Sequence, residues 1–333
     1  MIRMLPGRLS SWEFPAGEDD KRQGMKPWEL LRPAVLFPAL KSDWTDLYMK
    51  AKIYNVWFIV PLLLIFTVFF VIPTFISFFF SLTVWTLTDF RFVGLRNFEM
   101  FFSEHSLRIG ITNTLTYAGF TSGLKTIFGL FLALLLTWKL RTKNVLRAII
   151  FFPHLVSTVA VGITFTSLMH PTIGLFNTAL SVIGIAGPNW LGNPSIALFS
   201  VIGVDVWKGV GVATVIYIAG ITAISSTYYE AASIDGANAF QRFFRITLPL
   251  VRPAMNTVIL LSLISGLRTF DLIWTMTRGG PGFATDTLAS IIYRNYAFGF
   301  FGLSTAGNVL MFLLTVIIAF PLYKFLINRE VDQ

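Results

Sequence analysis

The sequence predicts an all-α, polytopic membrane protein with six transmembrane helices. Hydrophobic residues make up 55% of the 333 positions and charged residues only 13%, about half the charged share of an ordinary soluble domain. Membrane-length apolar stretches also recur along the chain. Crossing the hydrocarbon core takes about 20 apolar residues as a helix, and six stretches reach that length: 56–81, 111–137, 148–169, 196–223, 254–277 and 304–327.

The first 54 residues differ in composition from the rest of the chain. Their apolar runs are too short to span a membrane, and the mixed charges of "GEDDKRQ" precede Trp28 and Trp44. We expect residues 1–54 to form a cytoplasmic arm with an interfacial element whose tryptophans lie at headgroup depth. An unstructured tail fits the same composition. Residues 55–330 then form the transmembrane domain, whose first span is too long and too far into the chain for a cleavable signal.

The distribution of Lys and Arg predicts the orientation. The segments 1–55, 138–147, 224–253 and 324–333 fall on one side of the six spans and hold 18 of the 26 Lys and Arg residues, whereas the connections on the other side hold 5. Positively charged loops stay in the cytoplasm, so both termini are expected there. The net charge of +9 follows from this asymmetry, and no nucleic-acid partner is expected.

Charged side chains occur inside three of the predicted spans. They are Lys125, Asp205, Lys208, Arg268 and Asp271. Two opposite-charge pairs are spaced i, i+3, namely Asp205 with Lys208 and Arg268 with Asp271. The two residues of each pair share a helix face, so their charges can neutralise one another. Charges in hydrocarbon are costly and therefore face protein or a water-filled cavity. They either line a translocation pathway or hold helices together. Neighbouring polar and aromatic side chains favour the pathway: Asn113, Tyr117, Trp207, Asn256 and Trp274.

The sequence has few features of an enzyme or a metal protein. It contains no Cys, which excludes disulfides, cysteine-ligated zinc and iron–sulfur clusters. The three His residues show no metal-ligand spacing. "GFTSGLKT" at 119–126 lacks the spacing of a phosphate-binding loop and lies within a span. We therefore expect no catalytic residue, metal or cofactor in this chain, although a Ser–His pair brought together by folding remains an alternative.

The connection 224–253 contains more than a turn requires. "SSTYYEAASIDGANAF" predicts a short helix capped by Ser226 or Thr227. Glu230 is expected in its first turn, where a carboxylate complements the helix dipole. Gly236 lacks a Cβ and permits a bend or close packing. The segment is therefore suited to contact a cytoplasmic partner.

This connection resembles the coupling loop of binding-protein-dependent ABC importer permeases. The matching residues, at the family's spacing, are Glu230, Ala231, Ala232, Asp235, Gly236, Ala237, Gln241, Phe244, Ile246, Leu248 and Pro249. The resemblance implies that the loop docks in a cleft of an ATPase subunit and transmits its closure to the membrane helices. It also implies the type I ABC importer permease fold, with a six-helix core and alternating access.

A second stretch, 277–298, resembles the segment after the fifth helix in carbohydrate-importing, maltose-type permeases. The matching residues are Gly279, Gly280, Pro281, Thr285, Thr287, Leu288, Tyr293, Ala297 and Phe298. "FVGLRNF" at 92–98 and "NTLTY" at 113–117 also resemble early parts of such permeases. The resemblance implies a sugar or oligosaccharide permease of the bacterial cytoplasmic membrane.

The same resemblance implies the partners. These are a second homologous permease, an ATPase dimer that holds ATP and Mg²⁺, an extracytoplasmic solute-binding protein and membrane lipid. Three cationic residues, Lys125, Lys208 and Arg268, leave an acidic oligosaccharide open as cargo, and a polyol or glycerol phosphate also remains open. The rival mechanism is an ion-coupled secondary transporter that uses the intramembrane charges as its relay. It leaves the coupling-type loop unexplained.

Overall fold

The computed structural model describes residues 57, 59–86, 88–103, 105–138 and 141–328. The predicted arm 1–54 lies outside the described residues. The chain divides into two compact units, Met1–Val71 and Ile72–Gln333. In the first unit, α3 (Val60–Phe66) continues into the π-helical turn η3 (Thr67–Val71).

The second unit is almost entirely helical. Its elements are, in order, α4 (Ile72–Ser81), β1 (Thr83–Trp85), β2 (Phe90–Phe92), α5 (Arg96–Ser103), α6 (His105–Thr137), α7 (Lys143–Leu155), α8 (Thr158–Leu168), α9 (Leu175–Val182), α10 (Ala197–Ala223), α11 (Ser226–Ile234), α12 (Ala239–Arg242), η4 (Phe243–Thr247, a π-helical turn), α13 (Leu248–Leu250), α14 (Arg252–Leu267), α15 (Asp271–Met276), α16 (Leu288–Ala297) and α17 (Phe301–Ile327). The strands β1 and β2 form a small antiparallel hairpin with Val84 opposite Arg91.

Among the described residues, four helical stretches are long and apolar enough to cross a membrane. They are Val60–Ser81, Ser106–Thr137, Ala197–Ala223 and Phe301–Ile327. Counting each of two sharply bent helix pairs as one span raises the number to six. The predicted helical, multi-span class is confirmed, whereas several predicted boundaries are not.

The third predicted span, 148–169, is wrong as a single helix. The directions of α7 and α8 differ by 96°, and Val156 between them has extended backbone angles, φ −75° and ψ 139°. Pro153 lies in the last turn of α7, where it lacks an amide hydrogen to continue the helix. Hydropathy reports the composition of a stretch and carries no information about a change in direction.

The fifth predicted span, 254–277, is also not one helix. Its helix α14 starts two residues earlier and ends at Leu267, and the short α15 follows only at Asp271. The break leaves the carbonyl of Thr269 outside a helix, and Thr287 Oγ1 donates a hydrogen bond to it at 3.2 Å. A distant loop thus satisfies the polar group that the break would leave unpaired.

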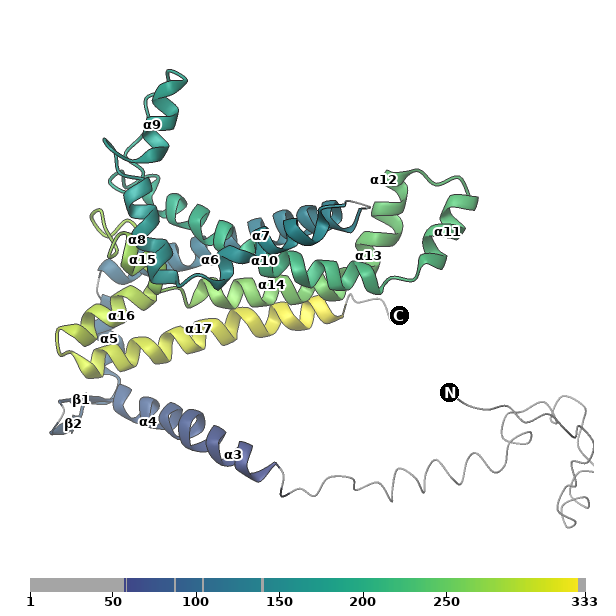
Figure 1. The fold of residues 1–333 in the computed structure, drawn as a ribbon. Coiled ribbons are helices and arrows are strands. Elements are labelled where there is room, and N and C mark those ends of the chain that lie inside the picture. The colour runs from purple at the N-terminus through teal and green to yellow at the C-terminus, as the bar shows by residue number, and fades with distance from the viewer. Residues whose placement is uncertain (1–56, 58, 87, 104, 139–140, 329–333) are drawn as a thin grey trace, which may run out of the picture. The chain divides into compact units, whose positions relative to one another are not determined.

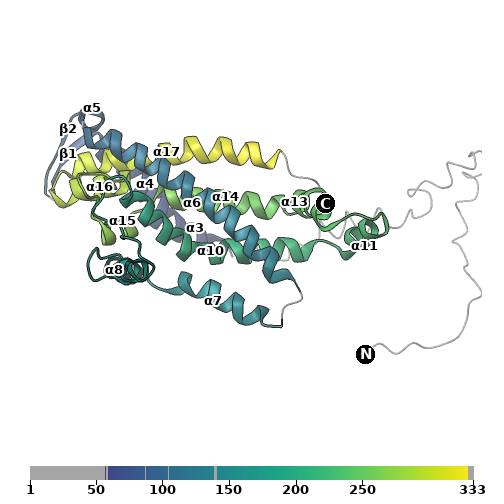
Figure 2. The ribbon, with the colours of Figure 1, turned by 90° about the horizontal axis from the view of Figure 1, so that it is seen from above.

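The long helices of the second unit lie side by side. Helix α6 packs against α10 and α14, and α17 packs against α14 and α16. Both views show α11 and the C-terminal end of α17 at the same end of this bundle, opposite to β1, β2 and α16 (Figure 1, Figure 2). Asn256 Nδ2, near the start of α14, donates to Leu326 O near the end of α17 at 3.2 Å. The connection 224–253 and the end of α17 therefore share one end of the bundle.

The interior contains three apolar clusters. One surrounds Tyr117, Val201 and Ile273, a second Tyr217 and Val258, and a third contains Phe101, Leu288 and Ile291. Many other large apolar side chains remain exposed along α4 and α17, for example Phe75, Ile317 and Phe320. Contiguous exposed apolar surface of this kind is rare in a soluble monomer and fits contact with lipid.

Candidate functional site

The first part of the coupling segment, α11, is capped one residue earlier than the sequence suggests. Ser225 is the N-cap, and its Oγ accepts a hydrogen bond from Thr227 N at 3.4 Å. The predicted caps Ser226 and Thr227 are therefore inside the helix. For the same reason Glu230 lies beyond the first turn, and the prediction that it complements the helix dipole there is wrong.

The C-terminal end of α11 explains Gly236. This residue has φ +75°, a left-handed conformation that glycine adopts at little cost. Gly236 N donates to Ser233 O at 3.2 Å, and Ala237 N donates to Ala232 O at 2.9 Å. These two bonds form a Schellman motif, which satisfies the last carbonyls of a helix. A Cβ at Gly236 would meet nothing within 4 Å, so the bend, and not packing within this chain, requires the glycine.

The second part restarts the helix by local hydrogen bonds. Asn238 is the N-cap of α12. Its Oδ1 accepts a hydrogen bond from the backbone N–H of Gln241, and its backbone N–H donates to Gln241 Oε1, both at 2.9 Å. This reciprocal pair is a capping box. Pro249 and Pro253 lie in the first turns of α13 and α14, where a missing amide hydrogen costs nothing.

The coupling segment exposes both polar and apolar side chains. Among the predicted coupling residues, Glu230, Ala231, Asp235, Gly236, Gln241 and Phe244 are exposed, and Ala232, Ala237, Ile246, Leu248 and Pro249 are partly buried. Ile234 and Phe240 are 88% and 71% exposed and were missed by the sequence analysis. Large apolar side chains in a segment outside every predicted span are the signal that would have identified them.

The intramembrane charges do not pair as predicted. Lys125 Nζ on α6 forms an ion pair with Asp205 Oδ2 on α10 at 2.7 Å, and the fully buried Tyr117 lies beside the same carboxylate. Asp205 is therefore not neutralised by Lys208. Within the described residues Arg268 and Asp271 form no ion pair either, because the break after α14 separates them and leaves both exposed.

Lys125 also borders a cavity of about 190 Å³ between α6, α7, α10 and α14. His154, Gly209, Ser262 and Ser265 contribute further parts of its wall, and none of them was predicted. An ammonium group, an imidazole and two hydroxyls can donate and accept hydrogen bonds inside an apolar surround, as solute sites do. Among the residues that the structure describes, no three His, Asp or Glu side chains come together to hold a metal ion.

The other predicted pathway residues lie elsewhere. Trp207 packs on Phe165 with ring centroids 5.0 Å apart, and Trp274 packs on Tyr293 at 4.8 Å. Asn256 is buried and bonded to the backbone of α17. Lys208 is partly buried. The structure thus brings Lys125, Asp205 and Tyr117 together, whereas Trp207, Trp274 and Asn256 make other contacts.

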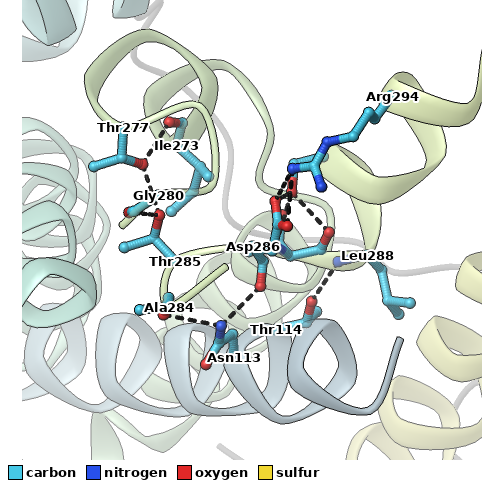
Figure 3. A network of polar contacts seen from close by, with 12 residues as sticks. Asn113, Thr114, Ile273, Thr277, Gly280, Ala284, Thr285, Asp286, Leu288 and Arg294 are labelled. Carbon is cyan, nitrogen blue, oxygen red and sulfur yellow. Dashed lines mark hydrogen bonds and ion pairs between the residues drawn. The ribbon is translucent and has the colours of Figure 1, made fainter. Parts of the chain in front are cut away.

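Asn113 belongs to a polar network with the loop between α15 and α16 (Figure 3). Its Nδ2 donates to Ala284 O at 3.0 Å and to Asp286 O at 2.9 Å. Thr114 Oγ1 accepts from Leu288 N at 2.9 Å. These bonds attach the loop between α15 and α16 to α6.

The loop itself is held by a buried ion pair. Both oxygens of Asp286, which is fully buried, accept from Arg294 Nη2 at 2.7 and 2.8 Å, and Ser290 Oγ donates to the same carboxylate at 2.9 Å. Thr277 and Thr285 bond through their hydroxyls at 2.7 Å. The second recognised stretch is therefore a rigid part of the bundle.

Comparison with known proteins identifies relatives of this chain. Residues 125–331 match the family model described as "Binding-protein-dependent transport system inner membrane component". The trehalose/maltose transport system permease protein MalF of Thermococcus litoralis is 39% identical over 68% of this chain and 76% of its own length. The sn-glycerol-3-phosphate transport system permease protein UgpA of Yersinia pestis is 31% identical over 72% of this chain and 81% of its own length.

A solved structure has a similar fold. One chain of a bacterial ABC transporter involved in the import of the acidic polysaccharide alginate superimposes with a TM-score of 0.72. The match covers 88% of this chain and 98% of that chain, at 23% sequence identity. The breaks in the third and fifth spans thus occur in a chain whose overall architecture is that of an ABC importer permease.

Proposed function

Because the chain belongs to the family of binding-protein-dependent transport system inner membrane components, we propose that it imports a sugar or oligosaccharide as one of two permease subunits. It is a multi-pass membrane transport subunit and not an enzyme. The 39% identical relative is named for trehalose and maltose, and others for multiple sugars and for sulfoquinovosyl glycerol. A carbohydrate is the cargo class that these names share most often. The UgpA relative supports glycerol phosphate as the second candidate.

The coupling segment is the observation that carries this proposal. Hydrogen bonds within the segment cap the end of α11 and the start of α12. The exposed side chains of Glu230, Ile234 and Phe240 are not needed for these caps and are available to another protein. We assign the docking of the ATPase to this surface. The ATPase would hold ATP and Mg²⁺. Its closure would move α12, η4 and α13, and this movement would be transmitted to α14.

The cavity beside Lys125 is our candidate for part of the cargo pathway. Its hydroxyls and imidazole match the hydrogen-bonding groups of a sugar, and its wall comes from four different helices. The Lys125 ammonium is neutralised by Asp205, which weakens the argument for an acidic cargo. A neutral sugar therefore fits this cavity better.

We also infer the topology from the charge asymmetry. Six spans, with α7 and α8 counted as one and the fifth beginning at α14, place both termini and the coupling segment in the cytoplasm. The loop between α15 and α16 then faces the solute-binding protein on the outside. The second permease would complete the pathway.

The experiment is affinity purification from mild detergent of the wild-type chain and of Ala231→Trp. We expect a Walker-motif ATPase and a second permease to co-purify with the wild type, and the bulky indole on the exposed face of α11 to remove the ATPase alone. Ala179→Trp, on the exposed α9, is the matched control and should retain both partners.

Two results would contradict the proposal. A wild-type chain that purifies alone, with uptake that survives ATP depletion but stops with an ionophore, would favour the ion-coupled transporter. Retention of the ATPase by Ala231→Trp at wild-type levels would remove the docking assignment and leave the family unaffected.

A further inference from the structure

An apolar cavity of about 550 Å³ lies between α8, α9 and α10. This volume falls within the roughly 300–1,000 Å³ of sites that bind small molecules in proteins. Half of its ten lining residues are aromatic, and Gly203 is also among them; the aromatic residues are Phe165, Phe176, Trp190, Phe199 and Trp207. It is separate from the Lys125 cavity, which none of these residues borders.

Hydrogen bonds outside the cavity hold its wall in place. Asn177 on α9 donates to Pro171 O at 2.9 Å and to Pro188 O at 3.1 Å, and its Oδ1 accepts from the indole of Trp190 at 2.7 Å. Ser200 Oγ on α10 donates to Trp190 O at 2.9 Å. Asn177 thus holds the Trp190 ring and Ser200 holds the Trp190 backbone, so hydrogen bonds from α9 and α10 position this part of the wall.

The chemistry of the wall favours an apolar occupant. The Ser200 hydroxyl and the Trp190 indole N–H already bond within the protein. A sugar entering this space would lose water around its hydroxyls and recover few hydrogen bonds, which costs free energy. An empty apolar cavity also deprives its lining atoms of contact partners, so an apolar chain that fills it is stabilising.

The position of the cavity indicates where that chain comes from. Figure 1 shows α9 projecting from the bundle, across the direction of α10 and α17. Residues 171–195 contain no Asp, Glu, Lys or Arg, and Leu175 and Val182 on α9 are 61% and 82% exposed. In a bundle that spans a membrane, this orientation places α9 along the lipid surface, where aromatic residues concentrate.

We propose that this cavity binds an acyl chain of a phospholipid from the membrane leaflet that α9 contacts. Phe199 and Trp207 are 47% and 45% exposed, so the aromatic wall can be reached from the outer surface of α10. The chain enters between α9 and α10, and its headgroup remains with the lipid surface beside α9. The occupied cavity supports the short α8 and α9, which follow the 96° break.

The test uses the full chain in phosphatidylcholine vesicles that contain a lipid with a photoreactive diazirine at the middle of one acyl chain. After irradiation, labelled residues are mapped by mass spectrometry. We expect labels on the cavity wall at the partly buried Phe165 or Phe176, in addition to outward-facing residues such as Phe199 and those of α17. Labels confined to outward-facing residues would overturn the proposal.

Two glycine variants make the test specific. Gly203→Leu should fill the cavity, because a Cβ there meets nothing within 4 Å, and labelling of the wall should fall to background. Gly123→Leu on α6 has equally open surroundings and should label as the wild type does. Wall labelling that persists in a folded Gly203→Leu protein, or that a free diazirine fatty acid reproduces while the phospholipid does not, would contradict a phospholipid site.

Discussion

Two loops at opposite ends of the bundle carry the recognised motifs, and they are built in contrasting ways. In the coupling segment, the bonds that close each helix join residues at most five positions apart, such as Ala237 to Ala232. In the loop between α15 and α16, bonds from Asn113 join residues more than 170 positions apart. The first loop keeps its shape alone and presents side chains outward. The second uses its polar groups to hold distant helices together, so a recognisable motif can mark either a contact surface or a structural clamp.

The largest expected difference in stability between variants of the two loops comes from removing an arginine. Arg294→Ala removes the ion pair between Arg294 and the fully buried Asp286 and should cost about 3–5 kcal/mol of unfolding free energy. Arg245→Ala changes an exposed residue of η4 and should change stability by about 0.5 kcal/mol or less. Unfolding of the purified variants in mild detergent measures both. Equal losses would mean that the two loops do not differ as described.

Adding one methyl group tests one positive-φ glycine from each loop. Gly236→Ala should cost only the left-handed backbone penalty, roughly 1–2 kcal/mol, because no atom lies near its Cβ. Gly279→Ala has φ +88°, and its Cβ would in addition overlap the Asp286 carboxylate, so we expect a larger loss. Asparagine tolerates φ above zero better than alanine. Gly236→Asn should therefore recover most of the unfolding free energy that Gly236→Ala loses. A smaller loss of stability at Gly279 than at Gly236 would contradict the close packing of Gly279 against Asp286 in the loop between α15 and α16.

A pair of asparagines separates long-range from local hydrogen bonding. Asn113→Ala frees two loop carbonyls from their donor and should cost about 1–3 kcal/mol. Asn238→Ala removes the cap of α12 and should cost about 1 kcal/mol, confined to an exposed segment. Hydrogen exchange should show faster exchange throughout the loop between α15 and α16 in the first variant. In Asn238→Ala, hydrogen exchange should become faster only in α12 and η4.

The smallest expected effect concerns a single hydroxyl that links α11 to η4. Tyr229 Oη and the buried Thr247 Oγ1 lie 3.0 Å apart, so Tyr229→Phe should cost about 1 kcal/mol. Tyr228→Phe, at the neighbouring exposed position, is the control and should be neutral. If ATPase activity in the assembled transporter falls with Tyr229→Phe alone, this contact contributes to force transfer. Unchanged activity in both variants would limit the contact to stability.

Sequence reasoning succeeded where the determining interactions are local. The short helix at the start of the coupling segment follows from neighbouring residues, although it ends at Ile234, and composition predicts the multi-span class. It failed where direction or register mattered. The 96° break after Leu155 leaves hydropathy unchanged. The pairing of Lys125 with Asp205 depends on how α6 and α10 are aligned, whereas an i, i+3 rule considers one helix at a time.

The π-helical turn η4 makes the length of the chain itself a functional quantity. Such a turn contains one more residue than an α-helical turn, so a single deletion within Phe243–Thr247 can be absorbed by conversion to α geometry. A deletion there would therefore leave Phe240 and Glu230 facing nearly the same direction relative to α14. A deletion within α14, which has no extra residue to lose, would instead rotate every residue before it by about 100°. The direction in which the coupling segment faces should therefore tolerate a lost residue in η4 and not in the helix that follows it.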